Sequence, residues 1–161
     1  MFRKPPPATD VEQLYRESRQ ALTSYFARRH GSTQSTEDLL QETFLRLMRR
    51  VDRCLLAASP KGYLFGIARH VSADTWRRTR PMLSEATALE SIEAPRSDQR
   101  LEEAREIIAV LPALQREILD LRFQHDLSYA EIAEALNIPI GTVRSRLHGA
   151  LEILREKMEQ D

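Results

Sequence analysis

Glycine and cysteine are scarce in this 161-residue chain, which has five glycines and one cysteine, Cys54. Few glycines, and few runs of Val, Ile or Thr at every second position, argue against an all-β sandwich or barrel. A single cysteine excludes a disulfide within the chain and a zinc site built from cysteines. The four histidines lie far apart without metal-ligand spacing. No metal, cofactor or catalytic residue is therefore predicted, and Cys54 is interpreted as a lone structural thiol.

Long apolar runs are also missing. No stretch approaches the ~18 residues that span a bilayer, and the basic start MFRKPPPATD has no apolar segment behind it, as a secretory signal would. We therefore expect a cytoplasmic protein with no membrane insertion. With 42% hydrophobic and 30% charged residues, the composition is typical of a helix-rich globular chain of one ordinary domain or two small ones.

Net charge is zero, but the two halves differ. Residues 1–80 hold 15 basic and 8 acidic side chains, whereas residues 81–161 hold 9 and 16. The positive half is a candidate for nucleic-acid binding. On charge alone, two solvated surfaces of opposite sign explain the split equally well.

Hydrophobic spacing predicts an all-α fold of two small helical domains joined by a flexible acidic linker. Residues 1–10 read as a disordered arm, residues 11–80 as three helices, residues 81–100 as the linker and residues 101–161 as the second domain. The three helices are expected from Val11 to Gly31, from Ser35 or Thr36 to about Val51, and from the Ser59-Pro60 cap to about residue 79.

The second domain contains a helix-turn-helix pattern. Ser128 and Glu131 form a capping box that starts a helix. Asn137-Ile138-Pro139 then makes a three-residue turn, because Asn tolerates the left-handed conformation. A longer helix follows at about 140–158, and in such motifs the second helix enters the major groove of DNA.

That longer helix has two predicted faces. The packed face holds Ile140, Val143, Leu147, Ala150, Leu151, Leu154 and Met158. The opposite face holds Gly141, Ser145, His148 and Gly149, flanked by Arg144 and Arg146. No carboxylate occurs between residues 135 and 151, so nothing there repels phosphate, and arginine can read guanine through two hydrogen bonds. The alternative is an ordinary helical hairpin with solvated arginines.

Two faces of the first domain are candidates for binding. On the second helix, one face away from the core carries Asp38, Gln41, Glu42, Leu45 and Arg49. An exposed Leu45 among charges suits a partner's surface, and a solvated face is the alternative. A metal-dependent nuclease using Asp38 and Glu42 is the weakest hypothesis, because it would need a third metal ligand that the sequence does not supply.

On the third helix, the expected core side holds Leu64, Ile67, Ala68, Val71 and Thr75. Another face gathers Arg69, His70, Ala73, Trp76, Arg77 and Arg80. A tryptophan among arginines is typical of a platform for single-stranded nucleic acid, because bases stack on the ring and guanidinium groups neutralise phosphates. Trp76 as a core residue is the alternative.

Four strings carry a family resemblance: TEDLLQETFLRL (36–47), SPKGYLFGIARHVSADTWRRTR (59–80), LPALQREILDLRF (111–123) and LSYAEIAEALNIPIGTVRSRLHGAL (127–151). Across residues 11–158 the chain resembles bacterial RNA polymerase sigma factors of the extracytoplasmic-function (ECF) group. The resemblance implies a promoter-recognition subunit without catalysis of its own. It would bind core RNA polymerase at the clamp and flap, direct it to promoters, help melt them, and be restrained by an anti-sigma factor.

The resemblance also implies roles for individual residues. Residues 11–80 would be a region 2-like domain and residues 101–161 a region 4-like domain. The expected polymerase-binding residues are Asp38, Gln41 and Glu42, with Leu45 on the same face. The expected minus-ten DNA-binding residues are Arg69, His70, Trp76, Arg77, Arg78 and Arg80. The expected minus-thirty-five DNA-binding residues are Arg122, Thr142, Arg144, Ser145, Arg146 and His148. The competing hypothesis is a plain helix-turn-helix regulator that binds an operator and never joins polymerase.

Overall fold

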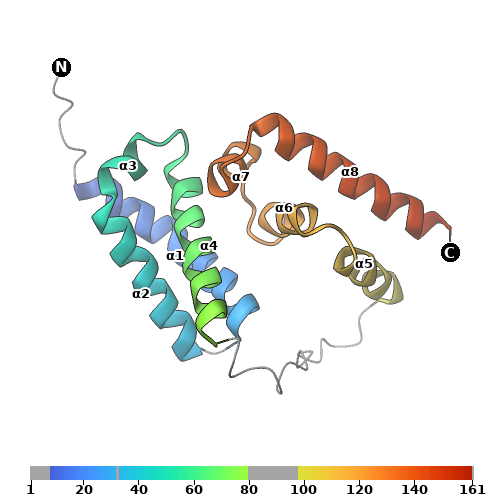
Figure 1. Ribbon diagram of the computed structural model, residues 1–161, viewed down its shortest axis with the longest axis horizontal. Coiled ribbons are helices and arrows are strands. Elements are labelled where there is room, and N and C mark those ends of the chain that lie inside the picture. The colour runs from blue at the N-terminus through green and yellow to red at the C-terminus, as the bar shows by residue number, and fades with distance from the viewer. Residues whose placement is uncertain (1–7, 32, 80–97, 161) are drawn as a thin grey trace.

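The computed structural model describes residues 8–31, 33–79 and 98–160 (Figure 1). Within these ranges the chain forms eight helices and no strand, as the all-α prediction requires. Residues 1–7 of the expected N-terminal arm, Arg80 and nearly all of the expected linker lie outside the described residues. The expected arm is wrong at residues 8–10, because α1 begins at Ala8, three residues before the predicted start.

The first domain contains α1 (Ala8–His30), α2 (Thr33–Arg49), α3 (Val51–Leu56) and α4 (Pro60–Thr79). Helix α2 begins two residues earlier than predicted, and the short helix α3 was not predicted. Arg50 has non-helical backbone angles, φ −131° and ψ 27°, and interrupts the helix. Val51 therefore starts a new helix and does not belong to the apolar face of α2. Gly31, at φ +70°, ends α1 in the left-handed conformation that glycine adopts without strain.

The core of the first domain lies between α1, α2 and α4. Its fully buried side chains include Leu22, Phe26, Leu47 and Leu64. The predicted core side of α4 is confirmed for Leu64, Ile67, Ala68 and Val71, which are buried, whereas Thr75 is half-buried.

The second domain contains α5 (Gln99–Ala109), α6 (Ala113–Phe123), α7 (Tyr129–Leu136) and α8 (Ile140–Glu159). Its core joins α6, α7 and α8 through Ile118, Leu121, Ile132, Val143 and Leu147, all of them buried. The predicted packed face of α8 is wrong at both ends of the helix. Ile140, the first residue of α8, is 40% exposed, and Met158 is 36% exposed. The C-terminal end of α8 extends beyond the other helices of the domain (Figure 1).

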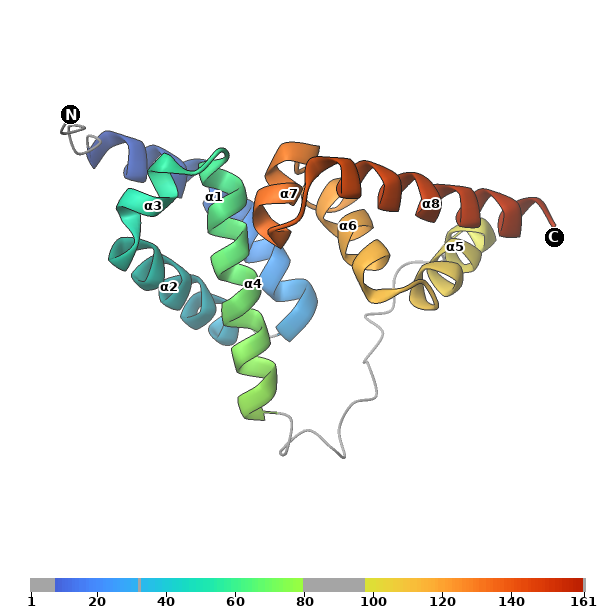
Figure 2. The ribbon, with the colours of Figure 1, turned by 45° about the horizontal axis from the view of Figure 1, so that its top comes forward.

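The two domains pack against each other, and their main contact joins α4 to α7. Both ribbon views place these helices side by side (Figure 2). Glycines allow the close approach, since a Cβ on Gly62 would lie 2.5 Å from the backbone oxygen of Glu131, and one on Gly66 would lie 3.1 Å from that of Ala135. Helix α4 is therefore covered on two sides, and Phe65 and Ser72 are buried although neither belongs to its predicted core face.

Candidate functional site

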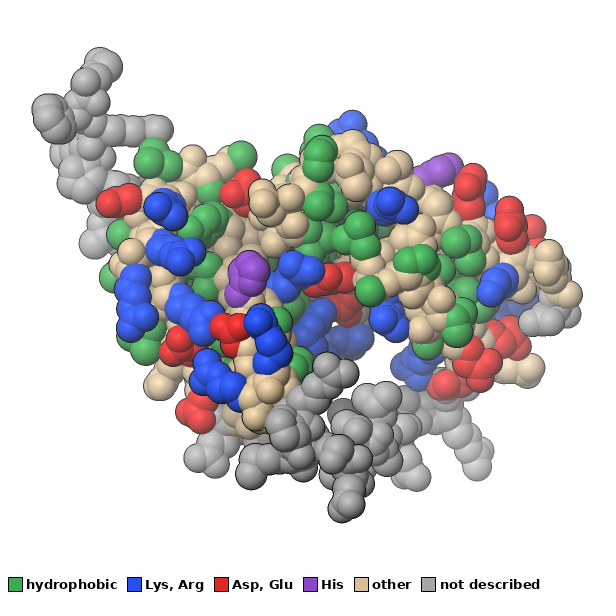
Figure 3. All heavy atoms as spheres, viewed as in Figure 1, with side chains coloured by type: hydrophobic (Ala, Val, Ile, Leu, Met, Phe, Trp, Pro, Cys, Tyr) green, Lys and Arg blue, Asp and Glu red, His purple; other side chains and the backbone are tan. Residues whose placement is uncertain are grey.

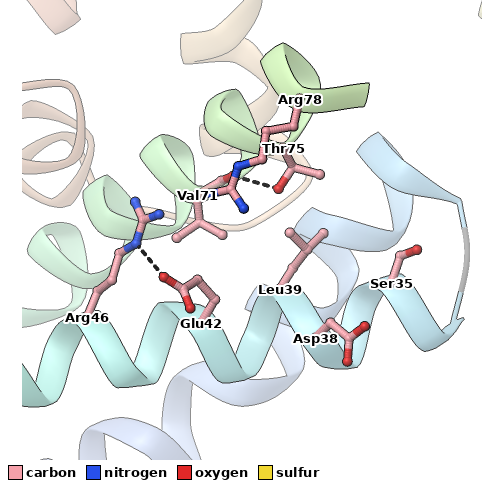
Figure 4. A pocket seen from close by; sticks show the side chains of 8 residues that line it. All are labelled: Ser35, Asp38, Leu39, Glu42, Arg46, Val71, Thr75 and Arg78. Atoms are coloured by element: carbon pink, nitrogen blue, oxygen red, sulfur yellow. Dashed lines mark hydrogen bonds and ion pairs between the residues drawn. The ribbon is translucent and has the colours of Figure 1, made fainter. Parts of the chain in front are cut away.

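The predicted polymerase-binding residues share one open face of α2. Asp38 and Gln41 are exposed, and Leu45 is 57% exposed. Glu42 is half-buried and accepts a 2.9 Å hydrogen bond from Arg46. Asp38, Glu42 and Arg46 line a shallow pocket of about 320 Å³ between α2 and α4, together with Arg78 of α4 (Figure 4).

Arg46 ties this face to α4, because its guanidinium also donates a 2.9 Å hydrogen bond to Asp74. That hydrogen bond from Arg46 lowers the pKa of Asp74, with a further contribution from the charges of Arg46, Arg77 and Arg78. Neither Arg46 nor Asp74 was predicted as part of the site. The i, i+4 spacing from Glu42 to Arg46 was a visible signal, whereas the contact with Asp74 depends on how the helices pack.

Three large apolar side chains of α2 and α3 are exposed. Leu45, Met48 and Leu56 are each between 57% and 59% exposed. Sequence reasoning found Leu45 and missed the other two. The i, i+3 spacing from Leu45 could have indicated Met48, but Leu56 lies on the unpredicted helix α3.

The predicted minus-ten residues do not form one open face. Arg69 binds Glu117 of α6 through two hydrogen bonds of 2.5 and 3.0 Å. Arg77 donates a 3.0 Å hydrogen bond to Asp74. His70 and Arg78 are exposed, Arg78 toward the pocket beside α2.

Trp76 is 39% exposed, so the alternative that it is a core residue is wrong. Its ring stacks on His30 of α1, with centroids 5.2 Å apart and planes 29° apart. Burial, and then the nearby Arg29, lower the pKa of His30, which favours a neutral ring beside the indole. A second pocket of about 320 Å³ lies beside this stack and is lined by residues of α1, α4 and α6: Tyr25, Arg29, Arg69, His70, Ser72, Ala73, Trp76 and Glu117.

The helix-turn-helix is built as its sequence predicts. The backbone N–H of Glu131 donates to Ser128 Oγ at 3.1 Å, and the N–H of Ser128 donates to Glu131 Oε2 at 2.8 Å. Asn137 closes α7 in the left-handed conformation, at φ 51°. These local bonds fix the direction in which α8 leaves the turn.

The first half of α8 presents a basic face. Arg144, Ser145 and Arg146 are exposed, Thr142 is half-buried, and Ser145 Oγ donates to the Thr142 carbonyl at 3.2 Å. His148 is exposed, but its Nε2 lies 3.1 Å from Glu152 Oε1, a neighbour that the sequence reasoning missed at an i, i+4 spacing.

Gly149 does not lie on the exposed face of α8, where helical spacing places it. Gly149 is half-buried and a Cβ there would lie 3.4 Å from Gln115 Nε2 of α6, so its predicted exposure is wrong.

Arg122 donates a 3.0 Å hydrogen bond to the Leu127 carbonyl, and its guanidinium carbon lies 5.4 Å from the centre of the Tyr129 ring. Arg122 therefore contacts the residues at the start of α7 and stabilises their position. Its side chain is 36% exposed.

Charge is distributed as the two halves of the sequence suggest. Lys and Arg side chains gather over α2 and α4, and Asp and Glu side chains gather at the opposite end, over α5 and the end of α8 (Figure 3).

Cys54 is buried in the first domain, and burial raises the pKa of its thiol to about 11. Among the described helices, none is long and apolar enough to cross a membrane.

Comparisons with known proteins match both domains. Residues 14–81 match the family model for sigma-70 region 2, and residues 101–154 match the model for sigma-70 region 4. The ECF RNA polymerase sigma factor SigC of Mycobacterium tuberculosis is 38% identical over 133 residues, which cover 79% of this chain and 72% of SigC. SigL of the same species is 31% identical over 159 residues, covering 93% of this chain and 89% of SigL.

Solved structures agree. The chain resembles the sigma factor RpoE, solved with the anti-sigma factor NepR from Bartonella quintana, at a TM-score of 0.63 and 25% identity, over 96% of this chain and 99% of RpoE. The fold of CnrH, solved with the cytosolic domain of CnrY, matches at a TM-score of 0.59 and 23% identity, over 96% of this chain and 91% of CnrH. With region 2 and region 4 matched in order and relatives aligned over most of their length, the chain belongs to the ECF RNA polymerase sigma factors, which direct transcription initiation at promoters.

Proposed function

We propose that this sigma factor uses three separate surfaces in transcription initiation: one binds core polymerase, and the other two bind the minus-ten and minus-thirty-five elements. Residues 11–80 act as the region 2-like domain, which binds core polymerase and the minus-ten element, and residues 101–161 act as the region 4-like domain, which binds the minus-thirty-five element. Residues 81–100 connect them.

The face of α2 is the polymerase-docking surface. The observation that carries this role is that Asp38, Gln41 and Leu45 stay exposed on α2, with the exposed Met48 one turn after Leu45. A domain that only needed to fold would not need a set of large apolar side chains in water, and such sets mark surfaces that bind other proteins. Glu42 adds a negative charge whose position is fixed by Arg46.

The basic face of α8 reads the minus-thirty-five element in the major groove. Arg144, Ser145, Arg146 and His148 supply donors on the first half of the helix, with Thr142 one turn before Arg146. Arg122 of α6 completes the proposed set. Arginine pairs with guanine through two hydrogen bonds, and arginines that reach phosphates add affinity that depends on salt.

The outer face of α4 holds unpaired bases of the minus-ten element. The partly exposed indole of Trp76 offers a stacking surface, and Arg69, His70, Arg77, Arg78 and Arg80 complete the proposed set. Base stacking on an aromatic side chain contributes ~1–3 kcal/mol per base, which is enough to favour strand opening when several contacts add.

The protein has no catalysis of its own and works in the cytoplasm, where core polymerase and promoter DNA meet. An anti-sigma factor is an expected further partner, because the similar sigma factor RpoE was solved in complex with the anti-sigma factor NepR.

Assembly on core polymerase is the direct test. Asp38→Arg combined with Gln41→Ala should abolish core binding and start-site-specific transcripts while leaving helicity and thermal melting nearly unchanged, since exposed substitutions change stability by about 0.5 kcal/mol or less. Asp52→Arg is a matched control, because Asp52 is exposed on α3. Full core binding by the double variant would refute the docking surface, and promoter binding without transcripts from the wild type would favour a plain helix-turn-helix regulator.

A further inference from the structure

A basic surface at the junction of α2 and α3 belongs to none of the three proposed binding surfaces. It consists of Arg49 and Arg50, at the end of α2, and Arg53 on α3, all three with exposed side chains. We propose that this basic junction binds the phosphate backbone of promoter DNA, beside the strand that α4 holds. The inference extends the proposed DNA-binding role of α4 and therefore rests on it.

The turn of backbone between the two helices brings Arg50 and Arg53 together. The Arg50 carbonyl accepts a 3.0 Å hydrogen bond from the N–H of Cys54, which closes one helical turn at the start of α3. Arg50 is the N-cap of α3 and Arg53 is its third residue, and side chains at these two positions are neighbours. Like charges that are neighbours on a helix repel each other, and an anion bound by both arginines would remove that repulsion.

Carboxylates that could neutralise the basic junction are scarce. Between residues 43 and 73 the sequence has five Arg, one Lys and a single acidic residue, Asp52. Within the described ranges, the side chains of the basic junction form no ion pair or hydrogen bond, and neither does that of Asp52. Arg46 of α2, in contrast, binds both Glu42 and Asp74. The guanidinium groups of the basic junction can therefore bind phosphate without displacing a carboxylate.

Charge separates the basic junction from the docking surface on the same helix. Asp38 and Glu42 precede Arg50 by twelve and eight residues, which is ~18 Å and ~12 Å along a helix. The docking surface thus carries negative charge on the first half of α2, and the basic junction carries positive charge at its end. A partner with basic groups suits the first, whereas an anionic backbone suits the second.

A short stretch of one DNA strand reaches from the proposed stacking surface on α4 to the basic junction. Helix α3 packs against α4, and Cys54 Sγ lies 3.6 Å from the Pro60 carbonyl oxygen, so the junction lies near the first residue of α4. Trp76 follows Pro60 by 16 residues, which is ~24 Å at 1.5 Å per residue. About seven nucleotides span that distance at 3.4 Å each. Lys and Arg side chains cover α2 and α4 on one face, where such a strand would run (Figure 3).

Arg50→Ala combined with Arg53→Ala tests the basic junction. Arg49 stays unchanged in this variant, because it follows Leu45 of the docking surface by one helical turn. A second variant, Arg50→Lys combined with Arg53→Lys, keeps both charges. Helicity and thermal melting should be nearly unchanged in both variants, since substitutions of exposed residues have small effects on stability.

The matched control is Arg16→Ala combined with Arg19→Ala. Both arginines are exposed on α1, and their removal changes the net charge of the chain by the same amount. A general effect of net charge on DNA binding would therefore be the same in the control and in the alanine variant of the basic junction.

The readout is the affinity of reconstituted holoenzyme for promoter fragments at several salt concentrations. One fragment carries the minus-ten region as an unpaired strand, and the other is a complete duplex. Loss of two phosphate contacts should reduce the slope of log affinity against log salt by ~1.4 on the unpaired strand or by ~1.8 on the duplex. The fragment that shows the reduction identifies the form of DNA that the junction binds. Contacts made by core polymerase are common to all variants and cancel in the comparison.

The lysine variant and the control should keep the wild-type slopes. Wild-type slopes on both fragments in the alanine variant, or an equal reduction in the control, would overturn the proposal. Loss of core binding by the alanine variant would also overturn it, because the junction would then belong to the polymerase interface. Transcripts from the wild type with unchanged slopes in the alanine variant would refute the basic junction alone. Absence of transcripts from the wild type would refute the proposed function, and this inference with it.

Discussion

Helices α4 and α8 have the same length of 20 residues and four Lys or Arg residues each, but the arginines differ in their partners. Helix α8 packs on one side only, and its Arg144 and Arg146 have no ion pair among the described residues. Helix α4 packs on two sides, and its Arg69 and Arg77 each bind a carboxylate. DNA can contact the arginines of α8 without displacing anything, whereas on α4 phosphates must replace Glu117 and Asp74. Binding at α8 should therefore depend on that helix alone, and binding at α4 on the arrangement of the domains.

The largest expected effect concerns what holds α8 in place. Leu147→Ala should lower the free energy of unfolding by ~2–5 kcal/mol, because Leu147 is buried in the core between α6, α7 and α8. Ile140→Ala is the matched control, since this residue of the predicted packed face is 40% exposed and should cost less than about 1 kcal/mol. Chemical denaturation of both variants measures the difference. Equal losses would mean that Ile140 packs as its spacing predicts.

The next effect tests the proposed strand-binding face of α4. Trp76→Ala should weaken binding to single-stranded DNA by ~1–3 kcal/mol and should reduce promoter opening, while closed complexes that depend on α8 persist. Permanganate footprinting of unpaired thymines measures opening, and a template with a pre-melted bubble should restore transcription.

His30→Ala serves as the control for Trp76→Ala, because it removes the stacking partner but leaves the indole for bases. It should bind single strands nearly as well as the wild type. Promoter opening by Trp76→Ala at the wild-type rate would show that the indole only supports α1.

A comparable effect is expected from the α8 arginine proposed to read a base. Arg144→Ala should cost ~1–3 kcal/mol in promoter affinity and relax the preference at one base pair of the minus-thirty-five element. Binding selections with randomised upstream elements measure both quantities. An unchanged sequence profile would contradict base reading by Arg144.

The smallest effect is expected at the neighbouring arginine. Arg146→Ala should weaken binding evenly across sequences and reduce the slope of log affinity against log salt by about 0.9, as the loss of one phosphate contact predicts. Titrations at several salt concentrations measure this slope. A sequence-dependent loss would instead make Arg146 a second base reader.

Much of the candidate site follows from short stretches of sequence. The cap at Ser128, the left-handed Asn137 and the exposed arginines of α8 all come from residues within a few positions of one another. The exposed face of α2 likewise follows from helical spacing. Helical spacing gave a wrong face at Met158, where α8 extends beyond the other helices of its domain. It also gave a wrong face at Gly149, which packs against Gln115 of α6.

By itself, the sequence determined that the chain is all-helical, where its capped helices begin, and which family it resembles, because helix caps, turns and apolar stripes act over a few residues. Only the tertiary structure decided that α4 packs against α7 and that Arg69 meets Glu117. These partners lie 48 or more residues apart in the chain. Helical spacing shows that Gly62 and Gly66 share one face of α4, but it cannot show which helix packs there, because that choice depends on the shape and charge of a surface formed by a separately folded domain.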